Sequence, residues 1–316
     1  MLRNAIVTTI VQIILYEHTK TTTSSLESDP SRFKTRDTLL NVLHDRIHDI
    51  NAFARAAVLK GWIDLVEARA VPLSHMHTVA SAGMDRLVDR TVNVRKAAVQ
   101  LLSTLLEYNP YASNLSKAPF VVKLKELEAI DESDVAENWS EEETQVHEKK
   151  IAFYTSTLEF IVQMEKALTM TTSFLNSNSP TDVLVAITFL VQGYQFHVDG
   201  SLVGLQKTLV LIWRSGEENI IAALCKTFTE VLFSACSDTK VYVQRLEMLL
   251  QGMTIAQSTS LEKLLQTMQE QKQLPSGLLL ALWQSLEKDV GRRHDILHLL
   301  VSNKHLFKEI CIYMLV

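Results

Sequence analysis

Asp49-Ile-Asn-Ala-Phe-Ala-Arg55-Ala-Ala-Val-Leu-Lys-Gly-Trp-Ile-Asp-Leu-Val is followed forty positions later by Asp89-Arg-Thr-Val-Asn-Val-Arg95-Lys-Ala-Ala-Val-Gln-Leu-Leu-Ser-Thr-Leu-Leu. The two stretches follow one pattern, because Asp matches Asp, Arg matches Arg and five apolar positions coincide. A self-similarity with a period of this size is typical of stacked pairs of helices. The stretch therefore predicts a repeated helical unit.

The segment between Pro72 and Pro110 holds one complete unit. Pro72 suits the start of a helix, where its missing N–H is not needed. Apolar residues then recur at helical spacing from Met76 to Val88. Residues 89–93 form the expected turn, and the second helix of the unit ends at Asn109-Pro110. This order predicts an all-α fold, a right-handed α-solenoid of helical pairs.

The composition agrees with a helical chain. The 316 residues are 47% apolar and include only 9 Gly and 6 Pro, so residues that interrupt helices are scarce. The 3 cysteines are an odd number and form no Cys-x-x-Cys pair, which argues against a disulfide framework and favours a reducing compartment.

Both ends of the chain carry apolar segments. Between Ile6 and Ile14 the apolar residues fall at three- and four-residue spacing with Thr and Gln among them, so we expect an amphipathic helix rather than a secretory signal. No apolar run is long enough for a membrane span, and we expect no membrane partner. The chain stops within the apolar segment 312–316, which predicts a piece of a longer solenoid.

Charge divides the chain into three parts. Residues 126–148 contain ten acidic residues and no Lys or Arg, although the net charge of the whole chain is only −5. We expect helical repeats over 1–118, an acidic insertion or linker over 119–148, and further helical repeats over 149–316. A solvated insertion is the favoured interpretation of the acidic part, and a docking element for a basic partner is the alternative.

The recurring Asp and Arg have a structural interpretation. Asp49 and Asp89 can accept backbone N–H groups at the start of the following helix, where the helix dipole favours a carboxylate. Arg55 and Arg95 can reach the Asp of their own or of the neighbouring repeat and form a charge-assisted hydrogen bond. We expect a ladder of Asp–Arg pairs along the stack.

No combination of residues indicates catalysis, a metal or a cofactor. His44 and His48 have a spacing that metal sites use, but no third ligand stands at a known distance from them. The chain contains no glycine-rich nucleotide loop and no Gly-x-Ser-x-Gly motif. We expect a protein that is not an enzyme and needs no cofactor.

Basic residues concentrate near one end of each repeat. A basic edge that recurs from repeat to repeat can follow the phosphates of DNA, although part of this charge is used by the ladder. The candidate DNA contacts are Arg46, Lys60, Arg86, Arg90 and Lys96.

The repeats carry a family resemblance. Their period, the Pro that opens the first helix and the Asp–Arg offset resemble HEAT repeats, which have an armadillo-like helical fold. His48-Asp-Ile-Asn-Ala-Phe-Ala-Arg, Val94-Arg-Lys-Ala-Ala-Val-Gln-Leu-Leu and Asn109-Pro-Tyr are similar to the central motifs of the condensin subunit 1 family. Thr181-Asp-Val and Leu274-Pro-Ser-Gly-Leu-Leu agree with this resemblance, whereas Gln206-Lys207 replaces a pair of Arg.

The resemblance implies a non-catalytic HEAT-repeat scaffold. Such subunits bind the kleisin subunit of condensin, approach the SMC ATPase subunits, contact DNA and support mitotic chromosome condensation. Their location would be the nucleus and mitotic chromosomes, with a cytoplasmic pool. Because HEAT repeats serve many functions, a scaffold of another complex, in transport or phosphatase regulation, is the alternative.

Overall fold

A computed structural model describes residues 2–23, 30–131, 140–214, 216–234, 238–275, 277, 278, 281, 282 and 284. These residues form helices and no strand, so the all-α class is confirmed for the described part of the chain. The chain divides into two compact units, Met1–Ser201 and Leu202–Val316.

The first unit consists of α-helices and two short 3-10 helices. Their bounds are α1 Leu2–Thr23, α2 Pro30–Asp45, η1 Arg46–His48, α3 Ala52–Glu67, α4 Leu73–Arg86, α5 Val92–Glu107, α6 Lys117–Asp131, α7 Glu141–Thr171, η3 Thr172–Asn176 and α8 Pro180–Gln195. The acidic residues of the expected insertion that the structure describes belong to α6 and α7, and residues 132–139 lie outside the described part.

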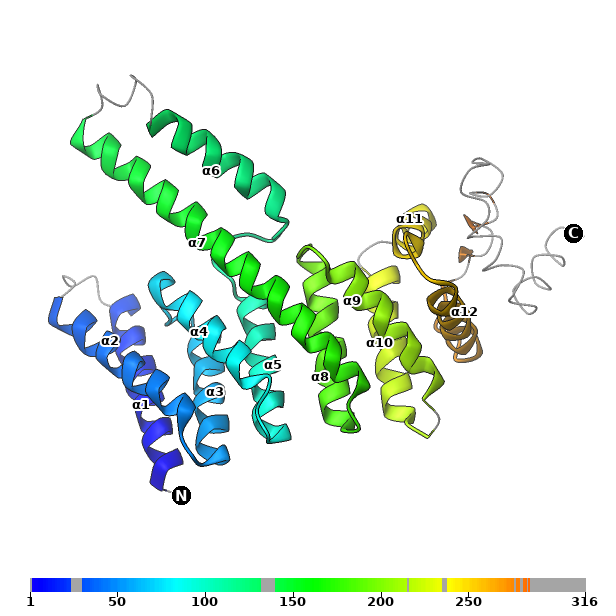
Figure 1. The fold of residues 1–316 in the computed structure, drawn as a ribbon, viewed down its shortest axis with the longest axis horizontal. Coiled ribbons are helices and arrows are strands. Elements are labelled where there is room, and N and C mark those ends of the chain that lie inside the picture. Colours follow the sequence, from blue (N-terminus) through cyan, green and yellow to red (C-terminus); the bar gives the residue numbers. More distant parts are fainter. Residues whose placement is uncertain are drawn as a thin grey trace, which may run out of the picture. The chain divides into compact units, whose positions relative to one another are not determined.

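The helices of the first unit form two layers (Figure 1). In one layer α1, α3, α5 and α8 lie side by side in that order. In the other layer α4 packs on α5 and α7, and α7 packs on α8. Helix α6 packs along α7, and together they form a long hairpin inserted between α5 and α8 in the sequence (Figure 1).

Local sequence explains where these helices begin and end. Asn51 caps α3 by accepting a hydrogen bond of 2.8 Å from the backbone N–H of Phe53. Ser140 and Glu143 form a reciprocal capping box at the start of α7. Helix α3 ends where Arg69 takes a left-handed conformation (φ 55°), and the backbone N–H of Ala70 returns to the carbonyl of Leu65.

The core of the first unit lies between the two layers. Its apolar residues come from the faces predicted by the 3.6-residue periodicity, and Trp62 is the largest of its fully buried side chains. At about 25 cal/mol per Å² of buried apolar area, this periodic burial is the main stabilising contribution to the unit. Fully buried large side chains of this unit include Ile14, Leu40, Leu43, Leu59, Leu65, Leu101, Phe160 and Phe189.

The described part of the second unit is also helical. It contains most of α9 (Ser201–Thr208), followed by η4 (Leu209–Trp213), α10 (Glu218–Phe233), α11 (Thr239–Leu250) and α12 (Ile255–Glu270). Helices α10 and α12 pack on η4, and α10 also packs on α11. The buried Gln206 donates hydrogen bonds to the carbonyls of Leu249 (2.8 Å) and Gln251 (2.9 Å), so its amide closes the end of α11.

Some element boundaries differ from the expectation. His44 belongs to α2 and His48 to η1, so the two imidazoles do not share one helix face. Helix α8 begins at Pro180, with Ser179 as its N-cap, rather than at Thr181-Asp182. Within the described residues, no helix combines the length and the hydropathy that a membrane crossing requires.

Candidate functional site

Arg55 joins two successive turns of the first unit. Its guanidinium forms a two-pronged ion pair with Asp89, with Nε 2.8 Å from Oδ2 and Nη2 2.9 Å from Oδ1. Its Nη1 donates to the carbonyls of Asp49 (2.8 Å) and Ile50 (3.0 Å). The fixed fork of Arg is what allows one side chain to make all four contacts.

The two Asp residues order the backbone of their turns. An Oδ1 of Asp49 accepts a hydrogen bond of 2.8 Å from the N–H of Asn51, and an Oδ1 of Asp89 accepts one of 3.0 Å from the N–H of Thr91. Asn51 and Thr91 are the N-caps of α3 and α5. Each carboxylate therefore fixes the direction in which the next helix leaves its turn.

The ion pair between Arg55 and Asp89 shifts the pKa of both groups. Burial alone would raise the pKa of Asp89, but the hydrogen bonds from Arg55 and from the N–H of Thr91 outweigh it, so this pKa lies below its usual value. The hydrogen bond to Asp89 raises the pKa of Arg55. Both groups are charged at neutral pH, and the pair serves as a structural link.

Further Arg–Asp pairs extend the ladder at both ends. Arg3 of α1 reaches Asp49 at 2.5 Å, and Arg95 of α5 reaches Asp182 of α8 at 2.6 Å. The forty-residue period cannot find Arg3 or Asp182, because neither falls at the repeated offset. Asp182 also accepts a hydrogen bond of 3.0 Å from Ser177, a partner that only the folded turn brings near.

The candidate DNA contacts do not form one cluster. Arg46, Arg86 and Arg90 lie in or next to the turns before α3 and α5, whereas Lys60 and Lys96 lie within those helices. Arg86 is 3.8 Å from Asp89 and shares its negative charge. The five side chains therefore do not build a single basic surface.

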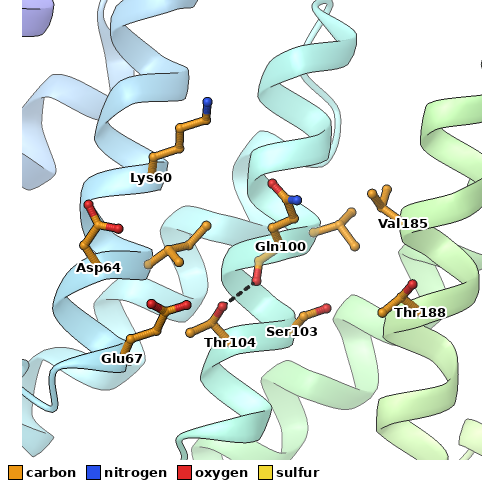
Figure 2. A pocket seen from close by; sticks show the side chains of 10 residues that line it. Lys60, Asp64, Glu67, Gln100, Ser103, Thr104, Val185 and Thr188 are labelled. Atoms are coloured by element: carbon orange, nitrogen blue, oxygen red, sulfur yellow. Dashed lines mark hydrogen bonds between the residues drawn. The ribbon is translucent and has the colours of Figure 1, made fainter.

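A groove runs across the surface of α3, α5 and α8 (Figure 2). Its volume is about 510 Å³, and helix α3 contributes Lys60, Asp64 and Glu67 to its wall. Hydroxyl and amide groups of α5 and α8 face these charges, and the Thr104 hydroxyl is bonded to the carbonyl of Gln100 at 3.0 Å. The remaining lining residues are Ile63, Val99, Ser103, Val185 and Thr188.

The lining of the groove fits a polypeptide better than a polyanion. Lys60 is its one basic side chain, and Asp64 and Glu67 would repel phosphates. Apolar side chains next to hydroxyl and amide groups suit an extended protein segment, which needs both apolar contact and hydrogen bonds. Among the described residues, no three His, Cys, Asp or Glu side chains gather as a metal site would require.

Comparisons with known proteins agree with one another. No family model matches the chain. The chain is 25% identical over 260 residues to "Condensin-1 complex subunit CAP-D2" of Arabidopsis thaliana, with 65% of this chain and 18% of the relative covered. It is 32% identical over 133 residues to "Condensin complex subunit 1" of Mus musculus, with 42% of this chain and 9% of the relative covered.

A fungal relative extends the similarity along the chain. "Condensin complex subunit 1" of Saccharomyces cerevisiae is 22% identical over 311 residues, which cover 78% of this chain and 26% of the relative. The chain thus spans about a quarter or less of the length of each of these three relatives.

Proposed function

Because the chain belongs to the condensin subunit 1 family, we propose that it is part of a non-catalytic helical scaffold of a condensin complex. The similarity to these relatives carries the proposal. The two-layered row of helices in the first unit supports it, since it suits a right-handed solenoid of HEAT repeats. Such a scaffold would bring partners together and leave ATP hydrolysis to the SMC subunits.

The kleisin subunit is the partner that we propose for the groove of α3, α5 and α8. A segment of kleisin in extended conformation would lay apolar side chains on Ile63 and Val185 and form hydrogen bonds with Gln100 and Ser103. The groove is supported on three helices that the ladder holds in order, so it is formed before the partner arrives. A preformed groove reduces the entropy lost on binding.

DNA contact is not part of this proposal. Lys60 stands beside Asp64 and Glu67, and Arg86 stands beside Asp89, so neither offers an uncompensated positive charge to phosphates. The nucleus and mitotic chromosomes are the proposed location, as the condensin role implies. A scaffold of a different complex remains the competing function, because helical repeats alone do not specify a partner.

Co-purification with kleisin tests the proposal. The chain, within the intact protein that contains it, is expressed with tagged kleisin of the same organism, and we expect the two to elute together. Ser103→Arg with Thr188→Arg fills the groove and should reduce the bound kleisin by about tenfold or more. Absence of kleisin from the unaltered complex would refute the condensin assignment.

A matched substitution controls for unfolding. Thr169→Arg changes another exposed helical Thr whose hydroxyl, like that of Thr188, bonds to the carbonyl four residues before it. Thr169 does not line the groove, so this variant should retain kleisin. Equal loss in both variants would mean that kleisin binds elsewhere or that the charge itself disturbs the fold.

A further inference from the structure

Two neighbouring turns of the first unit expose large apolar side chains. Ile50, Phe53 and Val88 have 93%, 71% and 76% of their surface exposed, the highest values among the large apolar residues described between α2 and α8. Turn residues are normally small or polar, and contiguous exposed apolar surface marks an interaction site. We call the surface of residues 46–53 and 86–90 the turn edge.

The ladder holds the turn edge together. Arg55 donates to the carbonyl of Ile50 at 3.0 Å and, with the same guanidinium, to the carboxylate of Asp89. Val88 and Arg90 flank that Asp in the sequence, so one side chain bridges the turns that carry the exposed residues. Nη1 of Arg95 fixes the second turn from below, at 2.9 Å from the carbonyl of Asp89 and 3.2 Å from that of Arg90.

The charges of the turn edge select the partner. Arg46 and Arg90 are exposed, and the described residues form no ion pair with either side chain. Asp45 and Asp85 are exposed at the ends of α2 and α4, so the local net charge is small. Long-range attraction of a polyanion is therefore weak here, and a carboxylate close to Arg90 would make a short-range contact.

We propose that the turn edge is a docking surface for a protein segment that combines apolar anchor residues with a carboxylate. The anchors would cover Ile50, Phe53 and Val88, and the carboxylate would pair with Arg90. This surface is distinct from the groove of α3, α5 and α8, and the proposal does not depend on the condensin assignment. Apolar contact at the centre with a charged pair at the rim is the usual anatomy of a protein interface.

Selection from a display library of random linear peptides tests the proposal. The intact protein serves as bait, and elution competes the bound peptides with free protein. We expect enriched peptides to combine large apolar residues with Asp or Glu. Ile50→Ser, Phe53→Ser and Val88→Ser together should weaken a synthetic copy of such a peptide by about thirtyfold, and Arg90→Glu should weaken it by about tenfold.

A control triple variant changes exposed apolar residues elsewhere in the same unit. Val122→Ser, Ile130→Ser and Val146→Ser lie on the hairpin of α6 and α7 and should leave the affinity unchanged. Circular dichroism and thermal unfolding establish that both triple variants are folded. Because apolar contact carries the affinity, binding should change little between low and moderate salt.

Three results would overturn the proposal. Failure to enrich any peptide would do so, as would enriched peptides that bind the turn-edge triple variant as tightly as the unaltered protein. Binding of duplex DNA that falls steeply with salt, is lost in Arg90→Glu and persists in the turn-edge triple variant would assign the edge to nucleic acid. Kleisin co-purification is unaffected by these outcomes, so the two proposals fail independently.

Discussion

Arg95 of α5 donates a hydrogen bond of 2.6 Å to Asp182 of α8, although the two residues are 87 positions apart in the chain. The whole hairpin of α6 and α7 lies between them in the sequence. The pair lets the row of helices continue from α5 to α8 as it does from α3 to α5. The insertion therefore interrupts the repeat in the sequence and not in the packing.

Removal of Asp182 should destabilise the first unit. Its side chain is 2% exposed, and Asp182→Ala leaves the guanidinium of Arg95 without a carboxylate partner in a largely buried position. We expect a loss of about 2–3 kcal/mol in the free energy of unfolding. Glu126→Ala removes the exposed partner of Lys123 and should cost less than about 0.5 kcal/mol. Urea unfolding of both variants measures the difference, and equal losses would contradict a structural role for the Arg95–Asp182 pair.

Arg55→Lys tests whether the geometry of the guanidinium matters beyond its charge. Lysine keeps the positive charge but cannot make the two-pronged contact with Asp89 together with the bonds to the carbonyls of Asp49 and Ile50. We expect a loss of about 1–2 kcal/mol in the free energy of unfolding. A double-mutant cycle with Asp89→Asn should show coupling between the two positions. Additive losses would mean that the two side chains stabilise the fold separately.

The pKa of Asp89 predicts how stability depends on pH. This pKa is lower in the folded protein than its ordinary value of 3.8, so the folded state favours the ionised carboxylate. The contribution is fully present above the ordinary value and is lost as pH falls through the folded pKa. The free energy of unfolding should therefore decrease below pH 3.8, and the curves of Asp89→Asn and the unaltered protein should approach each other there. Parallel curves would contradict the assignment.

The sequence predicts the helical class and the four central ladder residues because both depend on local spacing. Asp49 and Asp89 stand next to N-caps, and Arg55 and Arg95 follow six positions later, so one repeat suffices to interpret them. Asp182 is different, since its role depends on which helix α8 packs against. The groove is different for the same reason, because its three walls come from helices that only the packed layer brings together.

Gln206 shows what a family resemblance leaves out. Relatives are expected to carry Arg here, and the resemblance assigns no role to an amide. In the folded chain Gln206 is 4% exposed and closes the end of α11 through two backbone carbonyls. That role could not be predicted, because Leu249 and Gln251 lie more than forty residues away.

Gln206→Leu should therefore destabilise the second unit. Leucine has a similar volume but no N–H group, so the carbonyls of Leu249 and Gln251 would lose their donors in a buried position. We expect a loss of about 1–3 kcal/mol. Hydrogen exchange should become faster in α11, whereas amides of α3 in the first unit should be unaffected. Unchanged protection of α11 would rule out this capping role.

A pair of glycine substitutions tests how closely the layer of α1, α3 and α5 is packed. A Cβ on Gly61 of α3 would lie 2.6 Å from Cγ2 of Val11 in α1, and the branched valine has few rotamers with which to withdraw. A Cβ on Gly83 of α4 would lie 3.3 Å from Cδ2 of Leu102, the end of a longer and more adaptable side chain.

The two glycines therefore should respond in opposite directions to the same change. Alanine in a helix interior gains about 1 kcal/mol over glycine at either position. At Gly61 the overlap with Val11 should outweigh this gain, for a net loss of about 1–2 kcal/mol, whereas Gly83→Ala should be neutral or stabilising. The double variant Gly61→Ala, Val11→Ala should recover part of the loss, because the shorter side chain removes the overlap. Thermal unfolding measures all three variants, and a stabilised Gly61→Ala would show that α1 can shift away from α3 at little cost.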